Sequence, residues 1–143
     1  MSKIDMFIED TIYTPNNSNK DNSSFNDSIL IYGDNSLTEQ VIAYCESMKY
    51  EYKTIDDIQF ISMDYKYSCL LALSYNDANN LITSSVATKV YSIINVIALC
   101  NYQNNMKIYN DLNFIEVILR KNDTNSHLSI IKESLQNAVK YEG

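Results

Sequence analysis

The sequence predicts an α/β fold, with a doubly wound, mostly parallel sheet covered by helices on both faces. Two observations support this. Short apolar runs such as CLLALS (residues 69–74) and NVIALC (residues 95–100) are continuous rather than alternating, which is typical of parallel strands buried on both faces. Segments with helical spacing of apolar residues separate the runs, and such alternation winds a sheet by right-handed crossovers.

The elements follow one another from residue 28 onward. Strands are expected at the apolar runs, over residues 29–32, 51–55, 69–74, 95–100 and 114–118. Helices are expected over residues 37–48, 76–91, 102–112 and 126–141, where apolar residues recur three or four positions apart. In the second helix, Leu81, Ile82, Ser85 and the stem of Lys89 are expected on one side.

Residues 1–27 are expected to lie outside the domain, which then comprises residues 28–143. Residues 3–13 have a weak amphipathic pattern that would suit docking on the domain, on a second copy or on a partner, with disorder as the alternative. The Asn- and Ser-rich residues 16–28 are typical of a linker.

Composition excludes several classes of function. The chain has 143 residues and a net charge of −7, and its scattered cations form no run longer than Arg120–Lys121, so a nucleic-acid partner is not expected. Neither a membrane-spanning segment nor a signal peptide is apparent, and we expect a cytoplasmic protein without direct membrane insertion. Cys45, Cys69 and Cys100 are expected to be reduced and mostly buried.

The turn after the first strand resembles a dinucleotide-binding turn with one glycine. Gly33 follows the apolar run, but Asn35 and Thr38 stand where the pattern G-x-G-x-x-G has its second and third glycines. Asp34 places a carboxylate where a phosphate would need amides. Asp56 lies 23 residues after Gly33, close to the spacing of the acid that binds a ribose.

Ligands of doubly wound sheets bind beyond the carboxyl ends of the strands. The candidate cofactor-binding residues at this edge are Gly33, Asp34, Asn35, Asp56, Ser74 and Asn101. The alternative for the turn is a strand-to-helix connection without a ligand, and the favoured alternative for Asn101, as for Asn76 and Asp77, is a helix cap. No metal site or catalytic residue is predicted, and the single histidine, His127, is expected near the start of a solvated helix face.

The last helix carries an apolar seam. Leu128, Ile131, Leu135 and Ala138 are spaced three, four and three residues apart. This spacing suits a helix packed on the sheet, and it also suits a dimer contact.

The middle of the chain resembles the TrkA-N family, the regulatory nucleotide-binding domains (RCK N-lobes) of potassium transporters and channels. Residues 29–56 resemble the family's first βαβ unit, with Gly33 at its first glycine and Asp56 at its ribose acid. Residues 71–91 resemble its fourth strand and helix, with Asp77, Asn80-Leu81 and Ala87-x-Lys89 at typical positions. Residues 97–118 resemble its fifth strand through its sixth, with the family's Asn at Asn101.

This resemblance implies a Rossmann-like fold, binding of NAD or an adenine nucleotide, homodimers, a membrane potassium transporter as partner, and no catalysis. The chain departs from the family in two places. Two fingerprint glycines are missing, and only residues 57–68 separate the second strand from the fourth, so residues 58–63 are expected to form a stunted third strand or a short connecting helix.

We therefore expect a non-catalytic regulatory or interaction domain whose dinucleotide binding is weakened or lost, with no resident cofactor. A working NAD(H) or adenine-nucleotide sensor and a small nucleotide-dependent oxidoreductase are the alternatives. A receiver-like signalling domain would need an aspartate after the strand at residues 69–74, where the sequence has Ser74-Tyr75.

Overall fold

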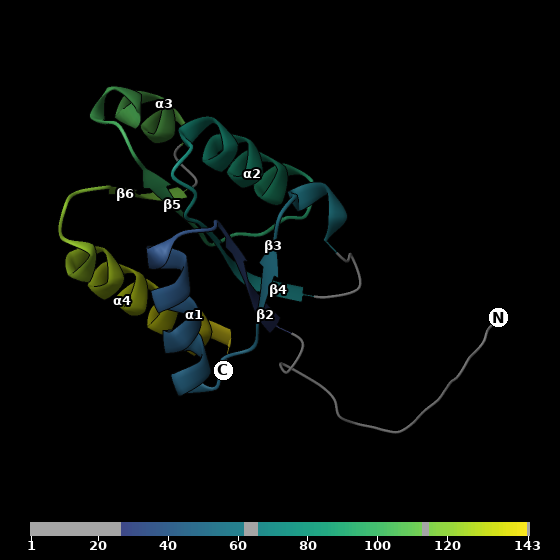
Figure 1. The fold of residues 1–143 in the computed structure, drawn as a ribbon. Helices are drawn as coiled ribbons and strands as arrows, with labels where there is room; N and C mark the ends of the chain where they lie inside the picture. The colour runs from purple at the N-terminus through teal and green to yellow at the C-terminus, as the bar shows by residue number, and fades with distance from the viewer. Residues whose placement is uncertain (1–26, 62–65, 113–114, 143) are drawn as a thin grey trace, which may run out of the picture.

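The computed structural model describes residues 27–61, 66–112 and 115–142. Its single sheet has five parallel strands in the order β3-β2-β4-β5-β6 (Figure 1). The strands are β2 (Asp27–Tyr32), β3 (Tyr52–Ile55), β4 (Lys66–Ala72), β5 (Val96–Cys100) and β6 (Ile115–Leu119). The amphipathic segment and most of the linker predicted before β2 lie outside the described residues.

Helices cover both faces of the sheet, which confirms the predicted fold class. They are α1 (Ser36–Met48), α2 (Asp77–Lys89), α3 (Met106–Asp111) and α4 (Thr124–Glu142), with short 3-10 helices η3 (Ile58–Phe60) and η4 (Gln103–Asn105). Figure 1 shows α1 and α4 on one face and α2 and α3 on the other.

Strand β5 is apolar along its whole length because both of its faces are buried. In β5, Ile97 and Leu99 pack in the core beneath α1 and α4, whereas Val96, Ala98 and Cys100 pack in the core beneath α2 and α3. Successive strand residues point to opposite faces, so a strand covered twice reads as a continuous apolar run. All three cysteines are buried free thiols, as predicted.

The chain reverses its direction of winding between β2 and β4, which makes their carboxyl ends the switch point of the sheet. In chain order the strands follow the arrangement 2-1-3-4-5 of flavodoxin-like folds. Between β3 and β4, residues 56–61 form only the 3-10 helix η3. Of the two alternatives for residues 58–63, the short connecting helix is therefore correct for residues 58–60. Residues 62 and 63 lie outside the described part of the chain.

The side of α2 that the apolar pattern singled out, with Leu81, Ile82, Ser85 and Lys89, is not its buried face. Ile82 is 60% exposed, and the buried residues of the helix are Asp77, Asn80, Thr83, Ser84 and Ala87. The apolar pattern of this helix misleads because its buried face is mostly polar. Two of its polar side chains, Asp77 and Asn80, bond to groups at the strand ends.

The apolar seam of α4 packs on the sheet. Ile131 and Leu135 are fully buried and Ala138 nearly so, all within the core shared with β2, β4 and α1. The dimer contact proposed as the alternative for this seam is therefore wrong for these three residues, because the chain's own sheet covers them.

Replacing Leu135 by aspartate should destabilise folding rather than only assembly. A carboxylate at a site of zero exposure loses the packing of a leucine and its own hydration, and we expect a loss of at least about 3 kcal/mol. Denaturant unfolding measures this. Ser129→Asp, at an exposed position of the same helix, is the control and should change stability little. A Leu135→Asp protein that keeps its unfolding midpoint would contradict the assignment.

Candidate functional site

Four of the six predicted binding residues lie together. Gly33, Asp34, Asp56 and Ser74 line one pocket of about 160 Å³ at the carboxyl ends of β2, β3 and β4, with Tyr32 and Ile55 completing its wall. Sites for drug-sized ligands usually measure about 300 Å³ or more. This pocket is therefore too small to enclose a nucleotide.

Gly33 has a structural reason to be glycine. Its φ of 143° lies in a region that L side chains rarely adopt. A Cβ at this position would lie 2.7 Å from the Thr38 Oγ1 and 3.0 Å from the main-chain carbon of Leu73. The turn thus packs directly against the end of β4, and this close contact explains the glycine without any ligand.

The Asn35 side chain bonds to both sides of the turn after Gly33. Its Oδ1 accepts hydrogen bonds from the Thr38 main-chain N–H at 2.9 Å and from the Thr38 hydroxyl at 3.0 Å. Its Nδ2 donates to the Leu73 carbonyl at 2.8 Å. Asn35 therefore caps the positive end of α1 and joins that end to β4.

Asp34 and Asp56 are both exposed and place two carboxylates around this small pocket. A second pocket of about 320 Å³ shares Tyr32 and Asp56 and continues over η3 to α2, where Asn79, Ile82, Thr83 and Val86 line it. Asp57, which follows Asp56, uses its carboxylate to accept from the Gln59 N–H at 2.9 Å and so caps η3. The carboxylates on this side of the edge disfavour anions.

The sixth predicted residue, Asn101, belongs to a different cluster, centred on Asp77. One Asp77 oxygen accepts from the Asn101 main-chain N–H (2.7 Å), the Asn101 side chain (2.8 Å) and the Tyr109 hydroxyl (2.8 Å). The other accepts from the Asn105 side chain (2.6 Å) and the Tyr102 N–H (3.3 Å). Five donors thus surround one nearly buried carboxylate.

These donors decide the charge of Asp77. Burial by itself would raise the pKa of Asp77, but the hydrogen bonds from Asn105, Asn101 and Tyr109 outweigh it and hold the pKa below its ordinary value. Burial, and then the bond to this carboxylate, raise the pKa of Tyr109 well above its ordinary value. Asp77 is therefore an ionised structural residue that fixes η4 and α3 to the start of α2.

The favoured interpretations of Asn101 and Asp77 as helix caps are wrong, whereas Asn76 caps α2 as predicted by accepting from the Asn79 N–H. Asn101 donates to the Ser74 carbonyl at 3.0 Å and to Asp77. Asn80 bonds both polar main-chain groups of Ser74 and the Leu99 carbonyl. Sequence reasoning missed this network, although Asn105 and Tyr109, one helical turn apart, were a signal for it.

His127 is buried, which contradicts the expected solvated face. It lies near the start of α4 as predicted, but it is only 2% exposed and its Nε2 accepts the Lys121 main-chain N–H at 2.8 Å. Burial lowers the pKa of His127, and Arg120 and Lys121 lower it further against the opposing charge of Asp123. The ring is therefore a neutral structural acceptor.

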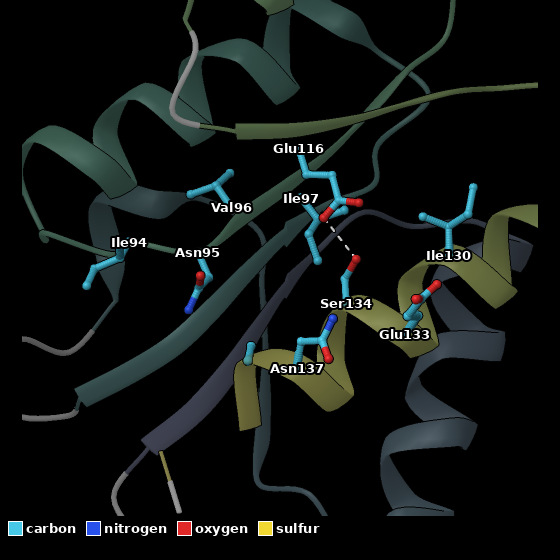
Figure 2. A pocket seen from close by; sticks show the side chains of 10 residues that line it. Ile94, Asn95, Val96, Ile97, Glu116, Ile130, Glu133, Ser134 and Asn137 are labelled. Carbon is cyan, nitrogen blue, oxygen red and sulfur yellow. Dashed lines mark hydrogen bonds between the residues drawn. The ribbon is translucent and has the colours of Figure 1, made fainter. Parts of the chain in front are cut away.

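A larger pocket, of about 410 Å³, lies away from the predicted site (Figure 2). It is formed where β5 begins and where β6 faces α4. The Ser134 hydroxyl donates to the Glu116 carboxylate at 2.9 Å across it. The exposed side chains of Ile94 and Ile130 stand at its two ends, and nothing in the sequence predicted it.

Comparison with models of known protein families and with curated protein sequences gives no match to this chain. In the part of the chain that the structure describes, no helix is long and apolar enough to cross a membrane. The same residues contain no group of three or more His, Cys, Asp or Glu side chains that could hold a metal ion.

The pKa of His127 predicts a pH-dependent stability. Because the folded state lowers this pKa, the unfolded chain binds a proton more readily, and stability is lost as the pH falls below the unfolded pKa of about 6.5. The melting temperature should therefore fall between about pH 7 and pH 5.5.

His127→Gln is the control, since a glutamine oxygen can accept the Lys121 N–H but does not titrate. The chain has no other histidine, so the variant should lose the slope in this range. An equal slope in both proteins would show that the buried imidazole is not its source.

Proposed function

We propose that this chain is a non-catalytic regulatory or interaction domain whose dinucleotide site is closed by its own side chains. One observation carries the proposal. The Asn35 Oδ1 accepts the hydrogen bond from the Thr38 N–H that a phosphate would otherwise accept. The Asn35 Nδ2 donates to the Leu73 carbonyl and so connects the turn to the end of β4. A ligand would have to replace both bonds, and losing such a cap costs about 1 kcal/mol.

Charge and space support the same proposal. Asp34 and Asp56 line a pocket of about 160 Å³, so a pyrophosphate would approach two carboxylates on a chain of net charge −7. The remaining hydrogen bonds, donated by ribose hydroxyls to the Asp56 carboxylate, would contribute only about 1.5–3 kcal/mol. A dissociation constant of 1 mM requires about 4.1 kcal/mol.

The single histidine and two of the three cysteines are poorly suited to catalysis. The imidazole of His127 accepts a main-chain N–H, and burial raises the pKa of the Cys45 thiol to about 11 and that of Cys69 still further. Such thiols are poor nucleophiles. These observations favour a regulatory role over an oxidoreductase.

A working nucleotide sensor is the second candidate. The observation that favours it is that Gly33, Asp34, Asp56 and Ser74 share one pocket, which opens beside the larger pocket over η3.

The partners of the domain are proposed from the resemblance to TrkA-N domains alone. They are a second copy of the chain and a membrane potassium transporter that the domain regulates from the cytoplasm. Three free thiols fit a reducing compartment. The buried α4 seam leaves pairing of two copies to another surface.

Calorimetric titration with NADH, NAD, ATP and AMP tests the proposal. We expect no binding tighter than about 1 mM that depends on Asp56, because the turn offers no unoccupied amide at Thr38. The isotherms of the unmodified protein and of Asp56→Ala should coincide. Asp111→Ala, on the exposed end of α3, controls for the loss of one charge.

A micromolar dissociation constant that Asp56→Ala abolishes and Asp111→Ala preserves would overturn the proposal. That result would establish the nucleotide sensor instead.

A further inference from the structure

A separate pocket lies at the carboxyl ends of β4, β5 and β6, beside the first residue of α4. It measures about 330 Å³, within the range of small-molecule sites. Its lining residues are Tyr75, Asn101, Tyr102, Arg120, Lys121, Asn122 and Thr124. It shares no lining residue with the pocket at Gly33.

The charge of this pocket is opposite to that of the protein. Its lining contains two adjacent cations, Arg120 and Lys121, and no carboxylate, although the chain has a net charge of −7. The longest cationic run of the sequence thus lies in a concave site, where an anion can contact both side chains.

Arg120 is held in position before any ligand arrives. Its guanidinium lies 3.5 Å from the centre of the Tyr75 ring and donates one hydrogen bond of 3.3 Å to the Asn101 Oδ1. Asn101 is itself fixed by Ser74 and Asp77. A stacked guanidinium keeps a fork of further N–H donors that suits phosphate oxygens.

The backbone beside Lys121 is also fixed. Its N–H is bound by His127, and Thr124 begins the 19-residue helix α4, whose amino end favours negative charge. This fixed backbone keeps the two cations beside the positive end of the helix.

Two nearby carboxylates are engaged elsewhere. Asp77 accepts its five hydrogen bonds from Asn101, Tyr102, Asn105 and Tyr109, and Asp123 accepts from the Asn125 N–H. Neither lines the pocket. Their charges weaken an anion's binding, whereas the two adjacent cations of the lining favour an anion with more than one charge.

We propose that this pocket binds a small, multiply charged phosphate compound between Arg120, Lys121 and the start of α4. The assignment goes beyond the proposed function, because it gives the domain a regulatory ligand independent of the closed turn at Gly33. A dinucleotide is too large to be enclosed in this volume.

Pyrophosphate is the probe, and its binding is measured by calorimetry or by the nuclear magnetic resonance shifts of the Arg120 and Lys121 amides. We expect saturable binding that weakens as salt rises. Arg120→Gln should raise the dissociation constant at least about tenfold, and Arg120→Lys should restore it only in part, because lysine keeps the charge and loses the fork. Citrate should bind more weakly, since its negative charge is spread over three separate carboxylates.

Lys89→Gln, an exposed position in the last turn of α2, makes the same charge change outside the pocket and should leave binding intact. The Asp56→Ala variant should also bind normally, which separates this test from that of the proposed function. Absence of saturable binding, or an equal loss in Lys89→Gln and Arg120→Gln, would overturn the assignment. Tighter binding of citrate than pyrophosphate would overturn the choice of phosphate.

Discussion

The close contact between the ends of β2 and β4 constrains the whole carboxyl edge of the sheet. These strands are neighbours at the switch point, and the Leu73 N–H donates to the Tyr32 carbonyl at 2.7 Å as they leave the sheet. The turn after β2 must then pass directly over Leu73, and only glycine fits at residue 33. Asn35 follows from the same contact, because it satisfies the Leu73 carbonyl and the amino end of α1 together.

The carboxyl edge has two halves with different chemistry. Over β2 and β3, Asp34 and Asp56 line a pocket of about 160 Å³ and the helix end is capped by Asn35. Over β5 and β6, the Asp77 cluster forms a rigid base on which Arg120 rests through Asn101. A buried carboxylate normally pairs with a cation, but here neutral amides and a hydroxyl satisfy Asp77. Arg120 therefore retains N–H groups for a ligand.

The order of the strands and helices could be predicted because it depends on patterns that are local in the sequence. Continuous apolar runs mark strands such as β5. The spacing of Gly33 and Asp56 predicted that both lie at the same edge of the sheet, and they line one pocket there. The direction of individual side chains could not be predicted in the same way. In the sequence, Asp77 and His127 resemble surface residues, because polar residues at helix starts are usually exposed. The burial of Asp77 depends on hydrogen-bond donors that lie 24 to 32 residues away in the sequence. The buried face of α2 could not be predicted for the same reason, since Asn80 is buried by its hydrogen bonds to the Ser74 and Leu99 carbonyls.

The most direct test of the closed turn is hydrogen exchange at the Thr38 amide, measured by nuclear magnetic resonance with and without NAD. A first-turn amide normally lacks a main-chain acceptor, so its protection reports the Asn35 side chain. Slow exchange in the ligand-free protein, unchanged by NAD, is the result expected if Asn35 occupies the place of the phosphate. Fast exchange that becomes slow only when NAD is added would show an open turn and a working nucleotide site.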